Sequence, residues 1–425
     1  MKTGIVNLLF TSSRRRFLAA MTLSLCSLQA LGDSNHYENI IIGDRPAGMG
    51  GAYTAIADDP SGLYYNPAGI VYATGSGISG SMNALHKTST TYKNALGGQT
   101  DWSRSSSNFL PNFFGIFQPF GKGKIGVSYA ALDSIRENQD QTFSNLNTGA
   151  NQIDEYVINF NNQEDVYNGG ISFAMPVNQD LSWGITLYAH NREQERILHQ
   201  YIHSNSGYEE YTNYYSVSEY GVRPVLGIMW SPMDKLSIGI NLNKTLIISS
   251  ETVNQTTQKA AGDTDITRTV STTHNKREMP LNLRLGAAYF ANERWLFSSD
   301  LSYYSSTSNN RMSVVNLAAG SEYYVTPAWA LRAGVFTNFA NTPKLANTGL
   351  AVNTTQAEHV DLYGVSLSVG RFTRTSNLSL GFNYSAGSGK AQLFPASGSG
   401  TASLQDTVIT SFTLFLSATH VQSSQ

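Results

Sequence analysis

The sequence is nearly free of cysteine: among its 425 residues only Cys26 is one. Cys26 lies in the N-terminal leader described below, so the mature chain has no cysteine. This excludes a disulfide framework, a thiol nucleophile and a cysteine-ligated metal site.

Charged residues are scarce too. Charged residues make up 14% of the chain, whereas a soluble domain typically has about 25%. The formal net charge of −2 gives no sign of a nucleic-acid partner.

Long apolar runs are also missing. A membrane-spanning helix needs about 20 mostly apolar residues, and beyond the leader no stretch holds such a run. What the chain does have is glycine, with 37 residues, and tyrosine, with 23. In lipid only helices and closed barrels satisfy every backbone polar group. An exported chain that is poor in charge and has no spanning helix therefore indicates a β-barrel.

The leader carries the signs of export. Three arginines (14–16) precede the apolar run "FLAAMTLSLCSLQALG", which ends in the small-residue site Ala30-Leu31-Gly32. This order predicts a signal peptide over residues 1–32 that is cleaved after Gly32. Because "SRRRFLA" also resembles a twin-arginine signal, the general secretory and twin-arginine routes both stay open.

Residues 43–69 read "GDRPAGMGGAYTAIADDPSGLYYNPAG" and suggest a phosphate-binding loop at first sight. A dinucleotide fingerprint needs G-x-G-x-x-G between a strand and a helix. Gly48 and Gly50 fit its first half, but Tyr53 stands at the third glycine position, and no alternation of strands and helices follows. We therefore expect no nucleotide and no other cofactor.

The rest of the chain alternates apolar and polar residues, the pattern of strands with one apolar face. In "KLSIGINLNKTL" Leu236, Ile238 and Ile240 fall on one face, and Ser237 and Asn241 on the other. The segments "LSWGITLYA", "LNLRLGAAY" and "NLSLGFNY" repeat this pattern. A soluble β-sandwich also has one apolar face, but its other face carries charge. Here the other face is mostly Gly, Ser, Asn and Thr, and aromatic residues end many of the strands, which is typical of a membrane barrel with aromatic girdles.

The spacing of turns predicts the number of strands. Six connections are tight and rich in turn residues: 120–124, 176–180, 231–235, 291–294, 325–329 and 374–377. We expect long polar loops between them, at 88–108, 135–165, 198–215, 251–278, 305–310, 341–358 and 388–404. Short turns at one end and long loops at the other are typical of outer-membrane barrels. Six hairpins, a first strand near 76–87 and a last one over 405–419 predict fourteen antiparallel strands. Pro224 falls inside a strand and predicts a bulge or a broken ladder there.

Residues 33–75 remain outside this alternation. A barrel of fourteen strands is too wide for its own side chains to fill, so we expect this segment to plug it. Here the sequence resembles the FadL/TodX family of outer-membrane transporters of hydrophobic compounds, whose N-terminal hatch carries a G-x-G-x-A…N-P-A-G pattern. The matching residues are Gly48, Gly50, Gly51, Ala52, Asn66, Pro67, Ala68 and Gly69.

The resemblance implies an all-β, 14-stranded antiparallel transmembrane β-barrel in the bacterial cell outer membrane. Its parts would be a signal peptide (1–32), an N-terminal hatch that plugs the lumen (33–75) and the barrel itself (76–425). It further implies passive transport of long-chain fatty acids or other hydrophobic molecules, gated by the hatch, with lateral diffusion out through a gap in the barrel wall. Gly48, Gly50, Gly51, Asn66, Pro67, Ala68 and Gly69 would form the gate. The implied partners are those hydrophobic molecules, outer-membrane lipid and the barrel-assembly machinery.

Other constellations are weaker. Arg284 and Arg332 fall on the predicted luminal face, where we expect contact with a luminal acid such as Asp300. His199 and His203 share a predicted loop, but no H-E-x-x-H context supports a metal site. Asp58 and Asp59, with Ser61, indicate a helix-end turn and cap. The segment "RILHQYI" (196–202) is the best candidate for an apolar groove.

No nucleophile–base pair has supporting context, so we expect no enzyme. Two other interpretations stay open. The same barrel architecture can serve as a secretion or surface-attachment scaffold that transports nothing, because a fold does not fix a function. An outer-membrane enzyme such as a lipase is the third class.

Overall fold

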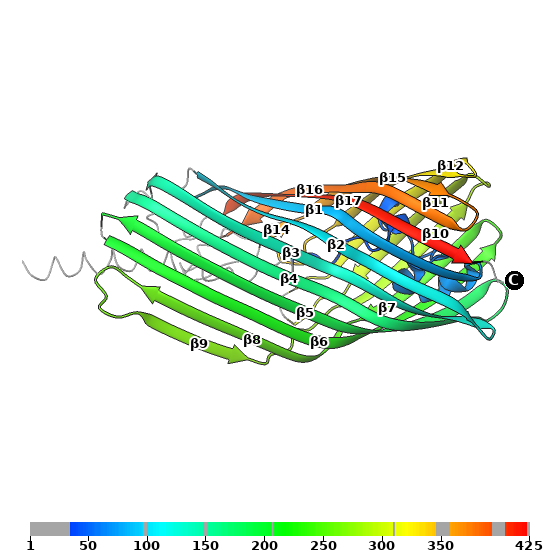
Figure 1. Ribbon diagram of the computed structural model, residues 1–425, viewed down its shortest axis with the longest axis horizontal. Helices are drawn as coiled ribbons and strands as arrows, with labels where there is room; N and C mark the ends of the chain where they lie inside the picture. The colour runs from blue at the N-terminus through cyan, green and yellow to red at the C-terminus, as the bar shows by residue number, and fades with distance from the viewer. Residues whose placement is uncertain are drawn as a thin grey trace, which may run out of the picture.

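The computed structural model describes residues 35–96, 100–147, 152–205, 207–308, 311–345, 358–392 and 404–422. The predicted signal peptide lies outside these residues. Within them one closed sheet makes up most of the molecule, and a short N-terminal segment with three helical turns lies inside it (Figure 1). No helix in the described ranges has both the length and the apolar character to cross a membrane.

The sheet is an antiparallel barrel of fourteen strands, as predicted. In the described residues its ladder consists of seventeen pieces, and three successive pairs, β7/β8, β9/β10 and β14/β15, each continue one line of the wall. The barrel closes because β1 pairs with both β2 and β17. The pieces are β1(Ser76–Leu96), β2(Thr100–Phe120), β3(Gly123–Asn147), β4(Gln152–Pro176), β5(Leu181–Ser204), β6(Gly207–Met233), β7(Leu236–Lys244), β8(Leu246–Lys259), β9(Thr267–Thr273), β10(Leu281–Phe290), β11(Trp295–Tyr304), β12(Val314–Thr326), β13(Trp329–Asn338), β14(His359–Val360), β15(Leu362–Phe372), β16(Ser376–Ala391) and β17(Gln405–Gln422).

All six tight turns lie where the sequence predicts them, but four of the expected long loops are wrong. One of them, 251–278, holds most of β8 and all of β9, which pair with each other. Strands β1 to β6 are 21 to 27 residues long, whereas about 9–11 residues cross a bilayer. The ranges 88–108, 135–165 and 198–215 therefore form mostly continuous hairpins that extend the wall at the loop end, on the left of Figure 1. The added residues are mostly polar, although some of their side chains form a buried apolar cluster around Trp102 and Tyr156, so they have no sustained apolar period in the sequence.

The two faces of the wall are assigned as predicted. On β7, Ile240 is 37% exposed on the outside, while Asn241 is 2% exposed on the inside. Four of the five tryptophans are exposed on the outside, close to the tight turns, and form an aromatic girdle at that end; they are Trp183, Trp230, Trp295 and Trp329.

Pro224 breaks the ladder on one side, as predicted. It stays in register with Leu187 of β5. Towards the next strand, the pairs jump from Val225↔Asn243 to Val222↔Leu246, and the wall changes there from β7 to β8. Proline has no N–H to donate, so the ladder is interrupted at this position.

The N-terminal segment, residues 35–75, lies within the barrel at the tight-turn end (Figure 1). It contains α2(Asp44–Gly48), α3(Gly62–Tyr65) and the 3-10 helix η2(Pro67–Tyr72). These turns are 4 to 6 residues long, too short to be stable alone. Packing against the wall therefore has to hold the segment in place.

Candidate functional site

Two glycines allow the segment to reverse direction after α2. Gly50 and Gly51 have φ values of 67° and 88°. Glycine adopts these positive φ values without a steric clash because it has no Cβ atom. The Gly51 amide donates to the Pro46 carbonyl at 2.8 Å and closes the helix end. Gly48 acts differently: a Cβ there would collide with the Ser368 hydroxyl of the wall. Its carbonyl accepts from the hydroxyl of Ser366.

Asn66 ties the second turn to both the segment and the wall. Its side-chain amide donates to the carbonyls of Thr54 and Ile228, each at 2.9 Å, and its side-chain oxygen accepts from the Ala68 amide at 3.2 Å. Asn66 thereby caps η2, which Pro67 begins, a position where the missing proline N–H costs nothing. Ala68 is anchored in turn, because its carbonyl accepts from the Ser182 hydroxyl at 2.9 Å.

Gly69 is needed for space. Gly69 is not among the described residues with positive φ. Instead, a Cβ on Gly69 would lie 2.5 Å from both the Cβ and the carbonyl oxygen of Ala57. Only glycine permits this close approach between the two turns of the segment.

Where the wall contacts the segment, many of its inward-facing residues are glycines. At seven inward-facing positions a Cβ would come within 3 Å of the segment's atoms, so these strands approach it at backbone distance. For example, a Cβ at Gly334 would meet Met49 and Gly50, and one at Gly184 would meet Pro67 and Ala68. The seven form what we call the glycine belt: Gly126, Gly184, Gly227, Gly239, Gly286, Gly320 and Gly334.

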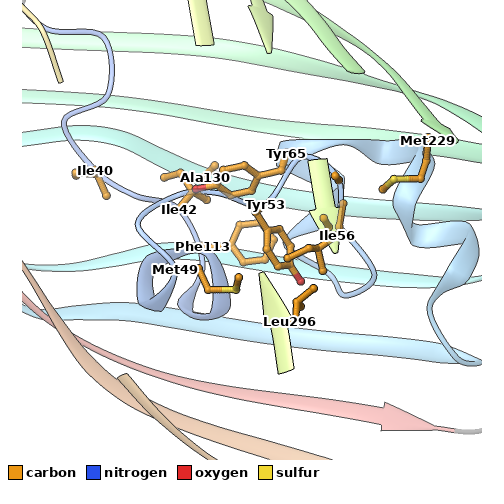
Figure 2. Close-up of a cluster of buried hydrophobic side chains, with 14 residues drawn as sticks. Ile40, Ile42, Met49, Tyr53, Ile56, Tyr65, Phe113, Ala130, Met229 and Leu296 are labelled. Atoms are coloured by element: carbon orange, nitrogen blue, oxygen red, sulfur yellow. The ribbon is translucent and has the colours of Figure 1, made fainter. Parts of the chain in front are cut away.

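Apolar side chains fill the space that the belt leaves. Met49, Tyr53 and Tyr65 of the segment pack with Phe113 and Leu296 of the wall in a buried cluster, which Figure 2 shows in close-up. The rings of Tyr53 and Tyr65 meet edge to face with centroids 5.7 Å apart. Together, belt and cluster make the lumen at this end a packed core.

Asp300 holds the middle of the segment. One of its carboxylate oxygens accepts from the amides of Tyr53 and Thr54, at 3.1 and 3.0 Å, and from the Thr54 hydroxyl at 2.6 Å. The Asn241 side chain donates to the Tyr65 carbonyl at 2.7 Å. These wall side chains satisfy backbone groups of a segment that has little ladder of its own.

The two predicted luminal arginines do contact acids, but Asp300 is not their partner. Arg284 Nη2 lies 2.6 Å from Glu38 Oε1 of the segment. Arg332 Nε lies 2.5 Å from Glu322 Oε2, and both side chains are fully buried. Glu322 also pairs with Arg45 of α2, at 2.9 Å. Asp300 is instead committed to the segment's amides.

Arg45, Glu38 and Glu322 also anchor the segment, but they were not predicted from the sequence. Glu322 alone left a signal, because it is the one charged side chain in β12 and faces inwards. A single buried carboxylate on the inner face of a strand needs a cation or a hydrogen-bond donor inside the barrel. Arg45 and Glu38 carry no periodic signal and are found only from the fold.

The turn at residues 58–61 forms where the sequence indicates it, but no side chain caps α3. The Ser61 amide donates to Asp59 Oδ1 at 2.8 Å, and Ser61 is the N-cap of α3. Asp58 pairs with Arg45 at 2.6 Å. Burial raises the pKa of Asp59 to about 6. Arg45 opposes this rise, while the nearby Asp44 and Asp58 add to it.

A cavity of about 450 Å³ lies on the loop side of the segment. The segment contributes Glu38, Tyr64 and Tyr65 to its lining, and the wall contributes Arg192, Glu219 and Arg223 among others. Most of these charges are paired: Arg192 contacts Glu164 at 2.7 Å and Glu219 at 3.4 Å. Arg223 donates to the Asn243 side chain and lies over the Tyr64 ring. The cavity thus combines aromatic faces with fixed charges.

The remaining candidates lie elsewhere. His199 and His203 belong to strand β5 and not to a loop, and they pair with Glu210 and Asp154 at 3.1 and 3.8 Å. The expected apolar groove at 196–202 is not open: Leu198 and Ile202 are buried in an apolar cluster with Trp102 and neighbouring residues.

The chain is similar to known proteins in structure but not detectably in sequence. No family model matches the chain, and no curated protein sequence matches it. Solved structures do. A FadL homologue of Pseudomonas aeruginosa aligns with a TM-score of 0.65 at 14% identity, over 91% of this chain and 99% of that one. The toluene transporter TodX of P. putida gives a TM-score of 0.64 at 12% identity, over 92% and 100%. The CymD monoaromatic hydrocarbon channel gives 0.58 at 14%, over 91% and 99%. The resemblance drawn from the sequence is confirmed in its fold: the chain forms a barrel of the FadL and TodX type.

Proposed function

We propose that the protein is a channel of the bacterial outer membrane, and not an enzyme, through which hydrophobic small molecules pass without an energy source. The supporting observation is the arrangement of the lumen, in which a cavity of about 450 Å³ sits above a floor that the N-terminal segment fills. The solved barrels with this fold include a toluene transporter and a hydrocarbon channel. Outer-membrane lipid would surround the apolar band, and the barrel-assembly machinery would insert it.

The physical reason for such a design is that a water-filled pore gives an apolar solute no favourable path. In the proposed mechanism the solute enters from the loop end, rests in the cavity and leaves sideways into lipid. The residues Gly48, Gly50, Gly51, Asn66, Pro67, Ala68 and Gly69 would keep the floor shut along the barrel axis.

Long-chain fatty acids and monoaromatic hydrocarbons are the two substrate classes to compare. The apolar cluster around Leu198 is filled, and the cavity carries charges beside its tyrosines. This lining favours a compact aromatic molecule, or a molecule with one polar end, over a long chain that needs an extended apolar groove.

The experiment measures uptake of a labelled monoaromatic hydrocarbon and a labelled long-chain fatty acid by a transporter-deficient host. Cells with the wild-type protein are compared with cells whose outer membrane lacks it, at matched surface amounts. We expect uptake above the empty membrane for at least one class. A Pro67→Ala, Gly69→Val variant should change the rate, because valine at 69 would overlap Ala57.

One observation favours the scaffold interpretation as the second candidate. Strand β9 is exposed at every residue and projects with β8 beyond the barrel body (Figure 1). If the wild-type protein gives no uptake of any apolar probe, the channel proposal fails, and the projecting hairpin becomes the first place to look for a bound partner.

A further inference from the structure

Strand β9 forms a free edge at the loop end of the molecule. Its seven residues, Thr267–Thr273, pair with β8, and among the residues that the structure describes no other strand pairs with them. All seven are exposed, and β9 lies at the lower margin of the molecule in Figure 1. Interruptions elsewhere in the ladder, such as the one between β2 and β3, are flanked by paired strands on both sides. The backbone N–H and C=O groups on the far side of β9 are therefore open to a further strand.

This edge has few of the features that keep exposed strands from pairing. Natural sheets protect their edges with proline, bulges or charged side chains. β9 has no proline and no register shift against β8, and its one charged residue is Arg268. The Arg268 guanidinium donates to the side-chain oxygen of Gln255 on β8 at 3.0 Å, so it points towards its own hairpin and away from the free edge. Five of the seven residues are β-branched, which favours an extended strand.

The residues of β9 are self-complementary about Val270. When two copies pair antiparallel with Val270 opposite itself, Thr269 of one copy faces Ser271 of the other, and Thr267 faces Thr273. Cross-strand hydroxyl pairs of this kind stabilise a sheet. No charged residue of the strand faces a like charge in this register. The occupant that fits the edge is therefore a second copy of the same strand.

The charges beyond the two ends of β9 are complementary in the same register. The turn before the strand carries Asp263 and Asp265, whereas the chain after it carries His274 and Lys276, and all four residues are exposed. An antiparallel pair brings the acidic end of each copy beside the basic end of the other. This contact occurs twice, once at each end of the pair, and opposite charges across a contact fix its register.

The direction of β9 determines how the two copies are oriented. β8 and β9 run roughly along the long axis of the barrel, as the other strands do (Figure 1). Antiparallel pairing of β9 with its copy therefore reverses the second barrel relative to the first. Two copies in one membrane point the same way and cannot pair like this, whereas copies in the membranes of two facing cells can.

We propose that the free edge of β9 is a homotypic attachment site, at which copies of this chain on neighbouring cells pair strand to strand and hold the cells together. Two strands of seven residues make a small contact, so a single pair is weak. The many copies on each cell surface act together and supply the strength. This role goes beyond the proposed channel function and does not depend on it.

The test changes the residue that faces itself across the pair. Val270→Lys places two positive charges opposite each other and Val270→Asp two negative ones, and like charges directly opposite destabilise a strand pair. A Lys copy opposite an Asp copy attracts instead. Each variant is displayed on a bacterial host that does not clump, in populations of two fluorescent colours, and microscopy counts the cells in clumps. Val270→Thr is the matched control, because it keeps a neutral β-branched residue. Heat-modifiable mobility and surface labelling verify folding and equal amounts.

We expect wild-type and Val270→Thr cells to clump, and Lys or Asp cells alone to stay as dispersed as cells without the protein. A mixture of Lys and Asp cells should form clumps that contain both colours. Lys cells that clump like the wild type, a mixture that stays dispersed, or wild-type cells that never clump each overturn the attachment site. Uptake of the labelled probe, measured on the same cells, bears on the channel function alone.

A single cysteine tests the register of the pair. The mature chain has no cysteine, so Val270→Cys forms a disulfide only with a second copy. When two epitope tags are carried by separate cells, a dimer with both tags reports a contact between cells. Ile266→Cys is the control: Ile266 is 63% exposed against 53% for Val270, but the register sets 266 opposite 274, so its two copies lie about 27 Å apart. We expect mixed-tag dimers at 270 and none at 266, and equal yields at both positions overturn the pairing.

Discussion

At the scale of single residues, the segment depends on one buried carboxylate shared by two cations. Glu322 accepts from Arg332 within the wall and from Arg45 of the segment. The Arg332 and Glu322 side chains have no exposed surface. Removing one partner of a buried pair costs more than the pair itself contributes, because an unpaired charge is left out of water.

We therefore expect Glu322→Gln to lower the free energy of unfolding by about 3–5 kcal/mol. A Glu322→Leu, Arg332→Met variant should recover part of this loss, since it removes the Arg332 charge together with its partner while Arg45 keeps its contact with Asp58. A urea titration of the barrel in lipid vesicles measures both values. The explanation is wrong if the double variant is as unstable as the single one.

Asp59 gives the segment a dependence on pH. Burial raises its pKa to about 6 in the folded protein, above the ordinary value of 3.8. The folded state therefore holds this proton more tightly than the unfolded chain does. Its stabilising effect is complete below pH 3.8, falls as the pH rises through 6 and is absent above that.

We expect the segment to be more protected at pH 4.5 than at pH 7.5. Asp59→Asn should remove this difference and increase protection at pH 7.5, because asparagine is neutral and keeps an oxygen for the Ser61 amide. Hydrogen exchange of residues 44–65, followed by mass spectrometry, measures the protection. If the Asn variant keeps the full pH dependence, another group is responsible.

At the scale of strands, the membrane-embedded part of the wall is predictable from sequence and the part beyond it is not. Lipid on one face and a packed lumen on the other impose a period of two, as on β7. Beyond the bilayer β3 is mostly polar and only single side chains such as Phe143 and Leu146 join the apolar cluster around Trp102, so a stretch such as "QTFSNLN" has the composition of a loop although it is a strand. Tight turns need particular residues and were found correctly.

The site is only partly predictable, for a different reason. The glycines and Asn66 of the segment serve local turns, so their pattern survives in the sequence. The partner of Arg284 is Glu38, 246 residues away, and no local pattern can carry that information. The glycine belt was visible as small residues on the luminal face. Its contact with the segment depends on strand register, which a sequence does not give.

The packed lumen changes how the two faces of β7 should be compared. We expect Ile240→Arg, on the lipid face, to cost about 2–4 kcal/mol of stability. Asn241→Arg is no mild control, because Asn241 is buried and bonded to Tyr65. Ser302 is the better luminal control: it lines the cavity, and its neighbour Leu301 lies two strands from Ile240 at the same height, through Leu285.

The comparison is made by denaturant titration in vesicles for Ile240→Arg and Ser302→Arg. An arginine at 302 lies opposite Arg284 but can extend into the cavity, whose lining includes the acids Glu38 and Asp300, so its cost should be below the cost at 240. Equal costs would show that the cavity does not admit a charged side chain.

At the scale of the whole molecule, the wall forms the closed hydrogen-bonded ladder and the N-terminal segment fills the lumen. The ladder closes through β1 and β17 without help from residues 35–75, so the wall has its own hydrogen-bonded structure. The segment supplies what the wall lacks, side chains in the lumen. At the seven positions of the glycine belt the wall carries no side chain inwards, so the segment fills space there that the wall would leave open. A fourteen-strand cylinder is already too wide to fill itself.

Deletion of residues 36–74, with the leader retained, should therefore turn the closed barrel into an open aqueous pore. The wild-type protein should give almost no ion conductance in a planar bilayer, whereas the deletion variant should give stable steps of current. It should also sensitise cells to large polar antibiotics that the outer membrane excludes. Heat-modifiable mobility on a gel verifies that the variant barrel is folded, and Ser302→Arg, which keeps the segment, serves as the non-conducting control. A folded deletion variant that conducts no better than the wild type would mean that the long strands and loops at the other end close the barrel, and that the segment serves as an anchor for the wall and not as its floor.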